Sequence, residues 1–206
     1  NGSLIVDQRV FCVQYRGNRR HQHRGYRRQR QSCIGDRATR GGGVTASGTV
    51  GGVTVGALIA CNAVGDVLDP DTARIVAGAR TADGLQLLDT RRALLRGELA
   101  QSVLPGTNTT IGVIATDAVI SKAQAQRLAV AAHDRLARAI NPVHTQLDGD
   151  TLFTLGTGAS GKQPGMLLLA TMAAEATARA TLRAVQAARA LTTPEGLHLP
   201  CAADIG

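Results

Sequence analysis

Apolar residues along this chain fall into short β-branched runs and longer stretches with helical spacing. Three runs bounded by turn residues predict buried strands: VTVGALIAC at 53–61, TTIGVIAT at 109–116 and TLFTLGT at 151–157. Strands that are apolar throughout are typical of sheets covered by other layers. The pattern therefore predicts sheets covered by helices on their outer faces.

The clearest helical pattern covers residues 121–140. Ser121 and Gln124 have the spacing of a capping box, in which each side chain binds the backbone of the other residue. Four residues share one apolar face of this helix: Leu128, Ala132, Leu136 and Ile140. We expect Asn141 and Pro142 to end it.

The remaining segments give weaker patterns. Residues 166–191 predict a long Ala-rich helix, and residues 89–104 predict a short helix followed by an exposed linker. We expect a Gly-rich loop at 40–48 and turns at 62–72, whereas 72–88 favours no single structure.

Composition narrows the class of protein. The 206 residues suffice for one well-buried domain, and since only 2% are aromatic, the core must consist of Ala, Val, Leu and Ile. The four cysteines are scattered and include no C-x-x-C pair, so we expect no metal site. The same pattern predicts a reducing compartment, the cytoplasm. Cys61 is expected to be a small buried apolar residue. No apolar run is long enough to span a membrane, no signal-peptide pattern is present, and no cofactor is expected.

The net charge of +8 is confined to one end of the chain. Residues 1–40 hold ten Arg and two Asp, so the rest of the chain is neutral. The Arg-rich stretch 16–31 has no apolar face and predicts a tail outside the core. It could bind nucleic acid, with Tyr26 stacking on a base, or be a solvated tail, or be an out-of-frame product of a GC-rich gene. Charge alone is weak evidence, so nucleic acid is not an expected partner.

Two further patterns resemble functional motifs, one for phosphate binding and one for metal binding, but each lacks a required feature. GTGASGKQ at 156–163 matches the start of a phosphate-binding loop, but Gln163 replaces the required Ser or Thr and Pro164 interrupts the following helix. We therefore expect a connector there. His133 and His144 have no metal-ligand spacing and are expected at or near the surface.

Two short stretches each allow two interpretations. In GTNTTIGVIATDA at 106–118, Asn108 can belong to a turn before a strand, or the bond between Asn108 and Thr109 can be one that the protein cuts in itself. In LDGDT at 147–151, Asp148 and Asp150 can form an Asx-type turn, or they can meet at the start of a strand and polarise a nearby hydroxyl or amine.

The sequence around these stretches resembles a known family. NTTIGVIATDA, AAHDRLARAINPVHTQLDGDT and VTVGALIACNAVGDVLDP together are similar to the L-aminopeptidase/D-esterase family, which includes β-aminopeptidases and nylon-oligomer hydrolases. The resemblance covers residues 37–206. It implies an α+β fold, a four-layer αββα sandwich like that of the N-terminal-nucleophile hydrolases. It also implies homo-oligomers that act on small peptides or amides.

The resemblance implies a self-cut between Asn108 and Thr109, with Thr109 as the nucleophile and Thr110 as the alternative if the cut is shifted by one residue. A Thr hydroxyl needs a base, and a freed α-amine with a pKa near ~7.7–8.0 can serve as one.

The resemblance also assigns supporting roles. Asp148 and Asp150 match the acidic pair that supports the nucleophile. Asn62 matches the asparagine that stabilises the oxyanion, a role that suits a neutral amide donor.

The sequence departs from the family at its N-terminal side. About forty residues precede the Gly-rich loop where full members carry over a hundred, and the lysine expected near Ser32 is absent. We therefore expect a divergent segment at 1–36 and a hydrolase domain at 37–206 that is truncated at its N-terminus and impaired in activity. The α part ends at Asn108 and the β part begins at Thr109. The alternative is a non-catalytic binding module with an Arg-rich arm.

Overall fold

The computed structural model describes residues 39–98, 108–192, 196 and 198–205. The main sheet has four strands: β1 (Gly43–Val50), β2 (Val53–Ala60), β5 (Ile111–Thr116) and β7 (Thr151–Gly156). The helices are α2 (Thr90–Leu95), α3 (Lys122–Leu136), α4 (Met166–Gln186) and the 3₁₀ helix η3 (Ala202–Asp204). The short strands are β3 (Asp66–Leu68), β4 (Ile75–Ala77), β6 (Ile140–Asn141), β8 (Leu191–Thr192) and β9 (His198–Leu199). The Arg-rich segment at 1–36 and the linker predicted around 99–107 lie outside the described residues.

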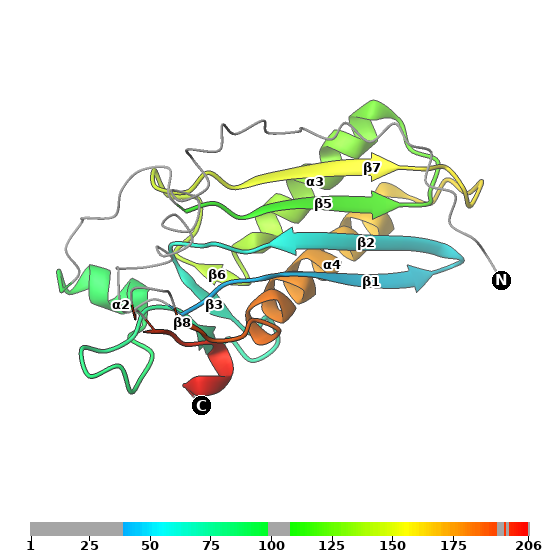
Figure 1. Ribbon diagram of the computed structural model, residues 1–206. Coiled ribbons are helices and arrows are strands. Elements are labelled where there is room, and N and C mark those ends of the chain that lie inside the picture. Colours follow the sequence, from blue (N-terminus) through cyan, green and yellow to red (C-terminus); the bar gives the residue numbers. More distant parts are fainter. Residues whose placement is uncertain (1–38, 99–107, 193–195, 197, 206) are drawn as a thin grey trace, which may run out of the picture.

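The main sheet has the order β1-β2-β5-β7, and both long helices cover one of its faces (Figure 1). β1 with β2 and β2 with β5 are antiparallel, whereas β5 and β7 are parallel and are joined through α3. A parallel pair needs a crossover connection of this kind. The α+β class and the helices against a sheet, both predicted from the sequence, are confirmed.

The core lies between this sheet and the two helices. Alternate sheet residues such as Val55, Ile59 and Ile114 are fully buried against the helices. The facing side of α4 is built of alanines, including Ala173 and Ala180, so the helix packs close to the strands. The expected core of Ala, Val, Leu and Ile is confirmed. In the described part of the chain, no helix combines the length and apolarity needed to cross a bilayer.

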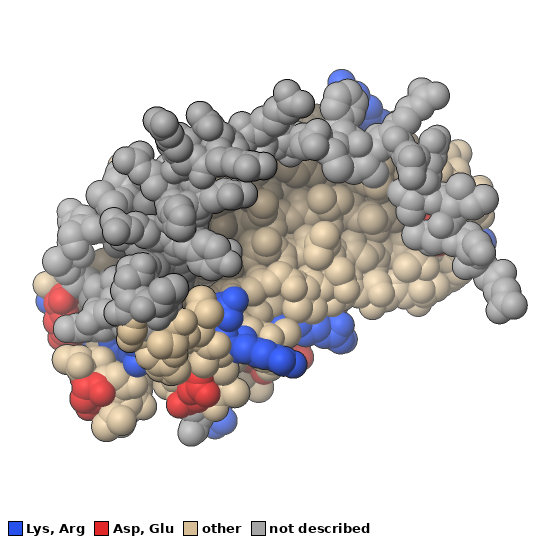
Figure 2. Space-filling view, in the orientation of Figure 1, with Lys and Arg blue, Asp and Glu red and all other residues tan. Residues whose placement is uncertain are grey.

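The opposite face of the sheet carries exposed apolar side chains. Leu58, Val113 and Phe153 are neighbours in register across three strands, and all three are exposed. The part of this face that remains visible in Figure 2 lacks charged side chains, which lie at its margins. Of the four layers expected for an αββα sandwich, the two long helices and the main sheet thus form two, with an apolar face where a second large sheet would pack.

The prediction of a Gly-rich loop at 40–48 is wrong, because β1 occupies most of this segment. Gly51 and Gly52 form a two-residue hairpin turn with φ values of 60° and 73°, which suits glycine and fixes the pairing of β1 with β2. Ala46 is buried against α4. Pairing and packing thus override the low intrinsic strand preference of glycine.

Other element boundaries also differ from the prediction. The capping box of Ser121 and Gln124 is confirmed, but α3 ends at Leu136 rather than at residue 140. Ile140 instead pairs with β3 as part of β6. The turns expected at 62–72 include β3, which pairs with β4. The short helix predicted within 89–104 is α2, which ends at Leu95. The helix predicted at 166–191 is shorter, since α4 ends at Gln186.

Asp66, the first residue of β3, connects the small sheet of β4, β3 and β6 to α2. Its side chain is 1% exposed and accepts hydrogen bonds from Thr90 N at 2.6 Å, Thr90 Oγ1 at 2.6 Å and Ala79 N at 3.2 Å. Burial raises the pKa of Asp66, and the donors from Thr90 and Ala79 oppose that shift. The carboxylate therefore holds three donors that water cannot reach.

We expect Asp66→Ala to lower the free energy of unfolding by about 2–4 kcal/mol, because it leaves these buried donors without an acceptor. Urea denaturation followed by circular dichroism measures the loss. Asp71→Ala, at an exposed position in the neighbouring turn, is the control and should change the free energy of unfolding by less than about 0.5 kcal/mol. Equal losses in the two variants would contradict the anchoring role.

Candidate active site

Three chain segments meet at one edge of the main sheet. Since β5 and β7 are parallel and in register, with Ile111 opposite Thr151, the residues just before each strand lie side by side. Since β2 is antiparallel to β5, with Ala60 opposite Ile111, the residues just after β2 reach the same edge. The topology therefore brings together residues 61–62, 108–110 and 148–150.

Backbone contacts fix these segments to one another. Thr109 N donates to Asn62 O at 2.8 Å, and Gly149 N donates to Asn108 O at 3.0 Å. Asn108 and Asp148 also form an isolated parallel bridge. The residues that the sequence predicts for the site, although up to 88 positions apart in the chain, are thus held on adjacent segments.

The Thr109 hydroxyl lies on the carbonyl group that precedes it. Thr109 Oγ1 donates to Asn108 O at 2.7 Å, and the same oxygen accepts from Gly149 N. Gly149 leaves just enough room for the hydroxyl, because a Cβ at position 149 would lie 2.7 Å from Thr109 Oγ1. Two donors therefore converge on the carbonyl oxygen between Asn108 and Thr109.

The two carboxylates have different partners. Asp150 has a side chain that is 4% exposed, and its Oδ1 accepts from Thr110 N at 2.7 Å. Burial raises the pKa of Asp150, the Thr110 N–H lowers it, and the charge of Asp148 raises it further. Asp148 Oδ2 accepts from Thr145 N and Thr145 Oγ1, both at 2.9 Å. Asp148 therefore closes a turn, whereas Asp150 binds the backbone directly after Thr109.

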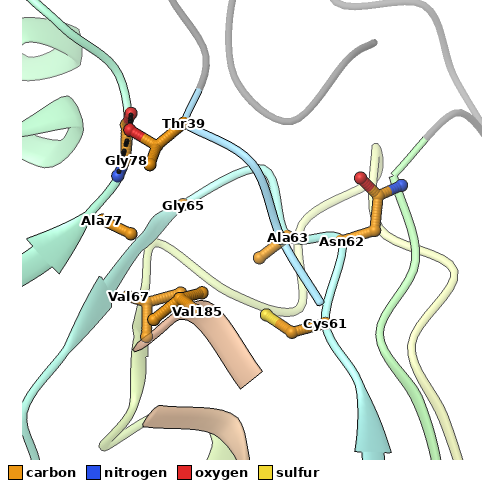
Figure 3. Close-up of a pocket in the computed structure, with 10 residues that line it drawn as sticks. Thr39, Cys61, Asn62, Ala63, Gly65, Val67, Ala77, Gly78 and Val185 are labelled. Carbon is orange, nitrogen blue, oxygen red and sulfur yellow. Dashed lines mark hydrogen bonds between the residues drawn. The ribbon is translucent and has the colours of Figure 1, made fainter. Parts of the chain in front are cut away.

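A small pocket lies next to Asn62, with a cavity volume of about 20 Å³, enough for one water-sized group. It is lined by Thr39, Cys61, Asn62, Val67, Gly78 and Val185, among others. Figure 3 shows the Asn62 amide turned away from Val67 and Val185, which close the pocket on its far side. Burial raises the pKa of the Cys61 thiol to about 11, so Cys61 is a protonated, apolar lining residue, as predicted.

Sequence reasoning missed one neighbour of the site, His144. Its ring stacks on that of His133, with centroids 4.0 Å apart, and its Nδ1 lies 3.6 Å from Asp150 Oδ2. The spacing of the two histidines gives no sign of this contact, because His133 lies on α3 and His144 in the loop after β6. The one available signal was that His144 closely precedes the LDGDT stretch.

Residues 156–163, for which the sequence predicted a connector, contain the end of β7 and the start of the loop that leads to α4. Residues 157–165 form neither helix nor strand, and α4 begins at Met166. Lys162 Nζ donates to Gly51 O at 2.7 Å. The segment is a connector tied to the β1–β2 hairpin. Within the described ranges, no group of three or more His, Cys, Asp or Glu side chains is arranged to hold a metal ion.

Comparison with known proteins identifies one family and several relatives. The model of peptidase family S58 matches residues 35–199. An uncharacterized aminopeptidase of Mycobacterium tuberculosis is 46% identical over 137 residues, which cover 62% of this chain and 38% of that protein. A 6-aminohexanoate-oligomer endohydrolase of Agromyces sp. is 30% identical over 111 residues, 52% of this chain and 31% of that protein. The chain thus spans well under half the length of these relatives.

A solved structure shows the same fold. The L-aminopeptidase D-Ala-esterase/amidase of Ochrobactrum anthropi, described as a variant of the Ntn-hydrolase fold, superposes with a TM-score of 0.53 at 22% identity. The match covers 84% of this chain and 49% of that one. The two long helices and the four-stranded sheet therefore belong to an Ntn-hydrolase-like fold.

Proposed function

The chain belongs to peptidase family S58, and from that premise we propose that it is a self-processing amide hydrolase. It cuts its own peptide bond between Asn108 and Thr109 and then uses Thr109 as an N-terminal nucleophile. The observation that carries the proposal is the 2.7 Å contact of Thr109 Oγ1 with Asn108 O. It places the hydroxyl against the carbonyl group that it must attack.

The self-cut is an N-to-O acyl shift followed by hydrolysis. Thr109 Oγ1 bonds to the carbonyl carbon of Asn108 and loses its proton, and the charge that develops on Asn108 O is stabilised by the Gly149 N–H at 3.0 Å. The bond from that carbon to Thr109 N then breaks, and the nitrogen takes up the proton that the hydroxyl released. Water cleaves the resulting ester and leaves Thr109 with a free amine and a free hydroxyl.

The mature site would act on other amides by the same chemistry. The freed amine of Thr109, with a pKa near ~7.7–8.0, is partly neutral at pH 7 and can take the hydroxyl proton. Asn62 O, 2.8 Å from Thr109 N, orients this amine. The Asn62 side-chain amide stabilises the oxyanion, and Asp148 and Asp150 hold the turn and the backbone around the nucleophile. Water then releases the acyl group from Thr109 Oγ1.

The substrates that fit this proposal are small peptides, from which the N-terminal residue is released, or related amides. The names of the relatives, an aminopeptidase and a 6-aminohexanoate-oligomer endohydrolase, support this class. Family membership favours the hydrolase over the alternative of a binding module with an Arg-rich arm. Homo-oligomeric assembly and a cytoplasmic location stay predictions.

Two measurements on the purified chain test the function. Intact mass and N-terminal sequencing should find two polypeptides, the second beginning at Thr109. A panel of amino-acid p-nitroanilides and 6-aminohexanoate oligomers should then reveal amide hydrolysis above the background of a Thr109→Ala chain purified in the same way.

A chain that stays in one piece and hydrolyses none of these amides would contradict the proposal. A cut chain without amidase activity would restrict it to self-processing.

A further inference from the structure

We propose that His144 and Asp150 form a proton-sharing pair, and that His144 acts through Asp150 as a positioning residue for the Thr109–Thr110 backbone. The inference rests on the proposed function, since it concerns the residues that hold the nucleophile. It depends on the proximity of two titratable side chains from the loop that joins β6 to β7.

The surroundings of Asp150 leave one of its oxygens without a hydrogen bond. Asp150 Oδ1 accepts from Thr110 N at 2.7 Å. Asp150 Oδ2 is buried and, within the part of the chain that the structure describes, has no hydrogen-bond partner. His144 Nδ1 lies 3.6 Å from that oxygen. A buried carboxylate with an unpaired oxygen is costly unless a positive charge or a proton compensates it.

The other nitrogen of His144 determines where its hydrogen lies. His144 Nε2 is 3.2 Å from the carbonyl oxygen of His133, and a carbonyl oxygen can only accept. Nε2 therefore carries a hydrogen. If Nδ1 were unprotonated and Asp150 ionised, two lone pairs would face each other, so a second proton belongs between Nδ1 and Oδ2. It resides on the imidazolium or on the carboxylic acid.

The backbone and the stacked ring hold His144 in this orientation. His144 has a φ of 56°, a left-handed conformation that non-glycine residues adopt at a cost. Its ring lies parallel to that of His133, with 9° between the planes. His133 belongs to the last turn of α3, so the helix fixes the ring against which His144 stacks. The backbone and the stacked ring together hold His144 Nδ1 beside Asp150 Oδ2.

The proton state of the pair affects the nucleophile through Thr110. An ionised Asp150 binds the Thr110 N–H as a charge-assisted acceptor, and a protonated one binds it more weakly. The groups whose charges act on Asp150 are Asp148, which raises its pKa, and His144 and His133, which lower it. Cys61 is also close enough to interact with Asp150, but its thiol is neutral. Loss of His144 thus favours the protonated, weakly bound state.

The test compares His144→Asn with the unchanged chain. Asn removes the positive charge and tolerates a left-handed backbone. Freshly translated, pulse-labelled chain is incubated between pH 4 and 9, and the uncut fraction is followed with time. We expect the acid limb of the rate profile to move to higher pH, and cutting at the acid end to slow by at least about tenfold, since the nucleophile is held less firmly. His144→Lys, which restores a cation, should return the limb toward its original position.

A second measurement does not depend on cutting. In an uncut Thr109→Ala background, the Asp150 carboxyl carbon is titrated by NMR, and His144→Asn should raise the pKa of Asp150. His198→Asn, a histidine on β9 outside the site, should change neither the titration nor the rate profile. An unchanged Asp150 titration in His144→Asn, or an unchanged acid limb in a chain that does cut, overturns the pair. A raised Asp150 pKa in a chain that never cuts supports the pair and contradicts the proposed function.

Discussion

Replacement of Thr109 by alanine should leave the chain in one piece. The Thr109→Ala variant lacks the oxygen that lies 2.7 Å from Asn108 O, so no ester can form and only uncatalysed hydrolysis of the bond remains. Loss of a nucleophile slows related reactions by at least about 10³-fold. Intact-mass spectrometry after overnight incubation should therefore find the full chain alone, whereas we expect the unchanged sequence to yield residues 1–108 and 109–206.

Two controls separate the hydroxyl from its surroundings. Thr109→Ser keeps the hydroxyl and should still cut. Thr110→Val removes the hydroxyl of the neighbouring threonine but keeps its shape and the N–H that binds Asp150, so cutting should continue. If Thr110→Val instead blocked the cut while Thr109→Ala did not, the nucleophile would be Thr110, the alternative that the sequence left open.

Local sequence signals predicted the parts of the fold that depend on neighbouring residues. The capping box at Ser121 and Gln124 involves residues three positions apart, and it forms as expected. The β-branched runs at 53–61, 109–116 and 151–157 gave β2, β5 and β7 to within about two residues. In these segments, the periodicity of the apolar residues and the local composition are sufficient to favour the observed structure.

The errors occur where distant segments decide the structure. β1 contains two glycines and becomes a strand because it pairs with β2 and packs on α4. Ile140 continues the apolar face of α3 in sequence but leaves the helix to pair with β3. The contact of His144 with Asp150 depends on a left-handed residue and on stacking against another element. The Gly51–Gly52 pair between Val50 and Val53 is a local hairpin signal for β1, whereas the departures at Ile140 and His144 depend on partners in other elements.

The predicted site residues are adjacent for a topological reason. Asn62 follows β2, Thr109 precedes β5, and Asp150 precedes β7. In a sheet with β2 antiparallel to β5 and β5 parallel to β7, these three positions must share one edge. The sequence supplied the strands and the residue types. The order of strands, which no local pattern encodes, placed them together.

The same edge explains the second large effect that we expect. Gly149→Ala should slow the self-cut by about 10²-fold, because the added Cβ would lie 2.7 Å from Thr109 Oγ1 and a shift of about 1 Å in a reacting group can cost that factor. The hydroxyl must rotate away from Asn108 O, while the Gly149 N–H stays available to that oxygen. The half-time of cutting, followed by gel electrophoresis of pulse-labelled chain, measures the effect.

Gly48→Ala is the matched control for this variant. Its Cβ would meet nothing within 4 Å, so the rate of cutting should stay within about twofold, and thermal unfolding should show both variants folded. The comparison distinguishes steric displacement of the hydroxyl from a general effect of adding a methyl group to the sheet. Equal rates for Gly149→Ala and the unchanged chain would mean that Thr109 Oγ1 attacks from a different rotamer, in which its contact with Asn108 O plays no part.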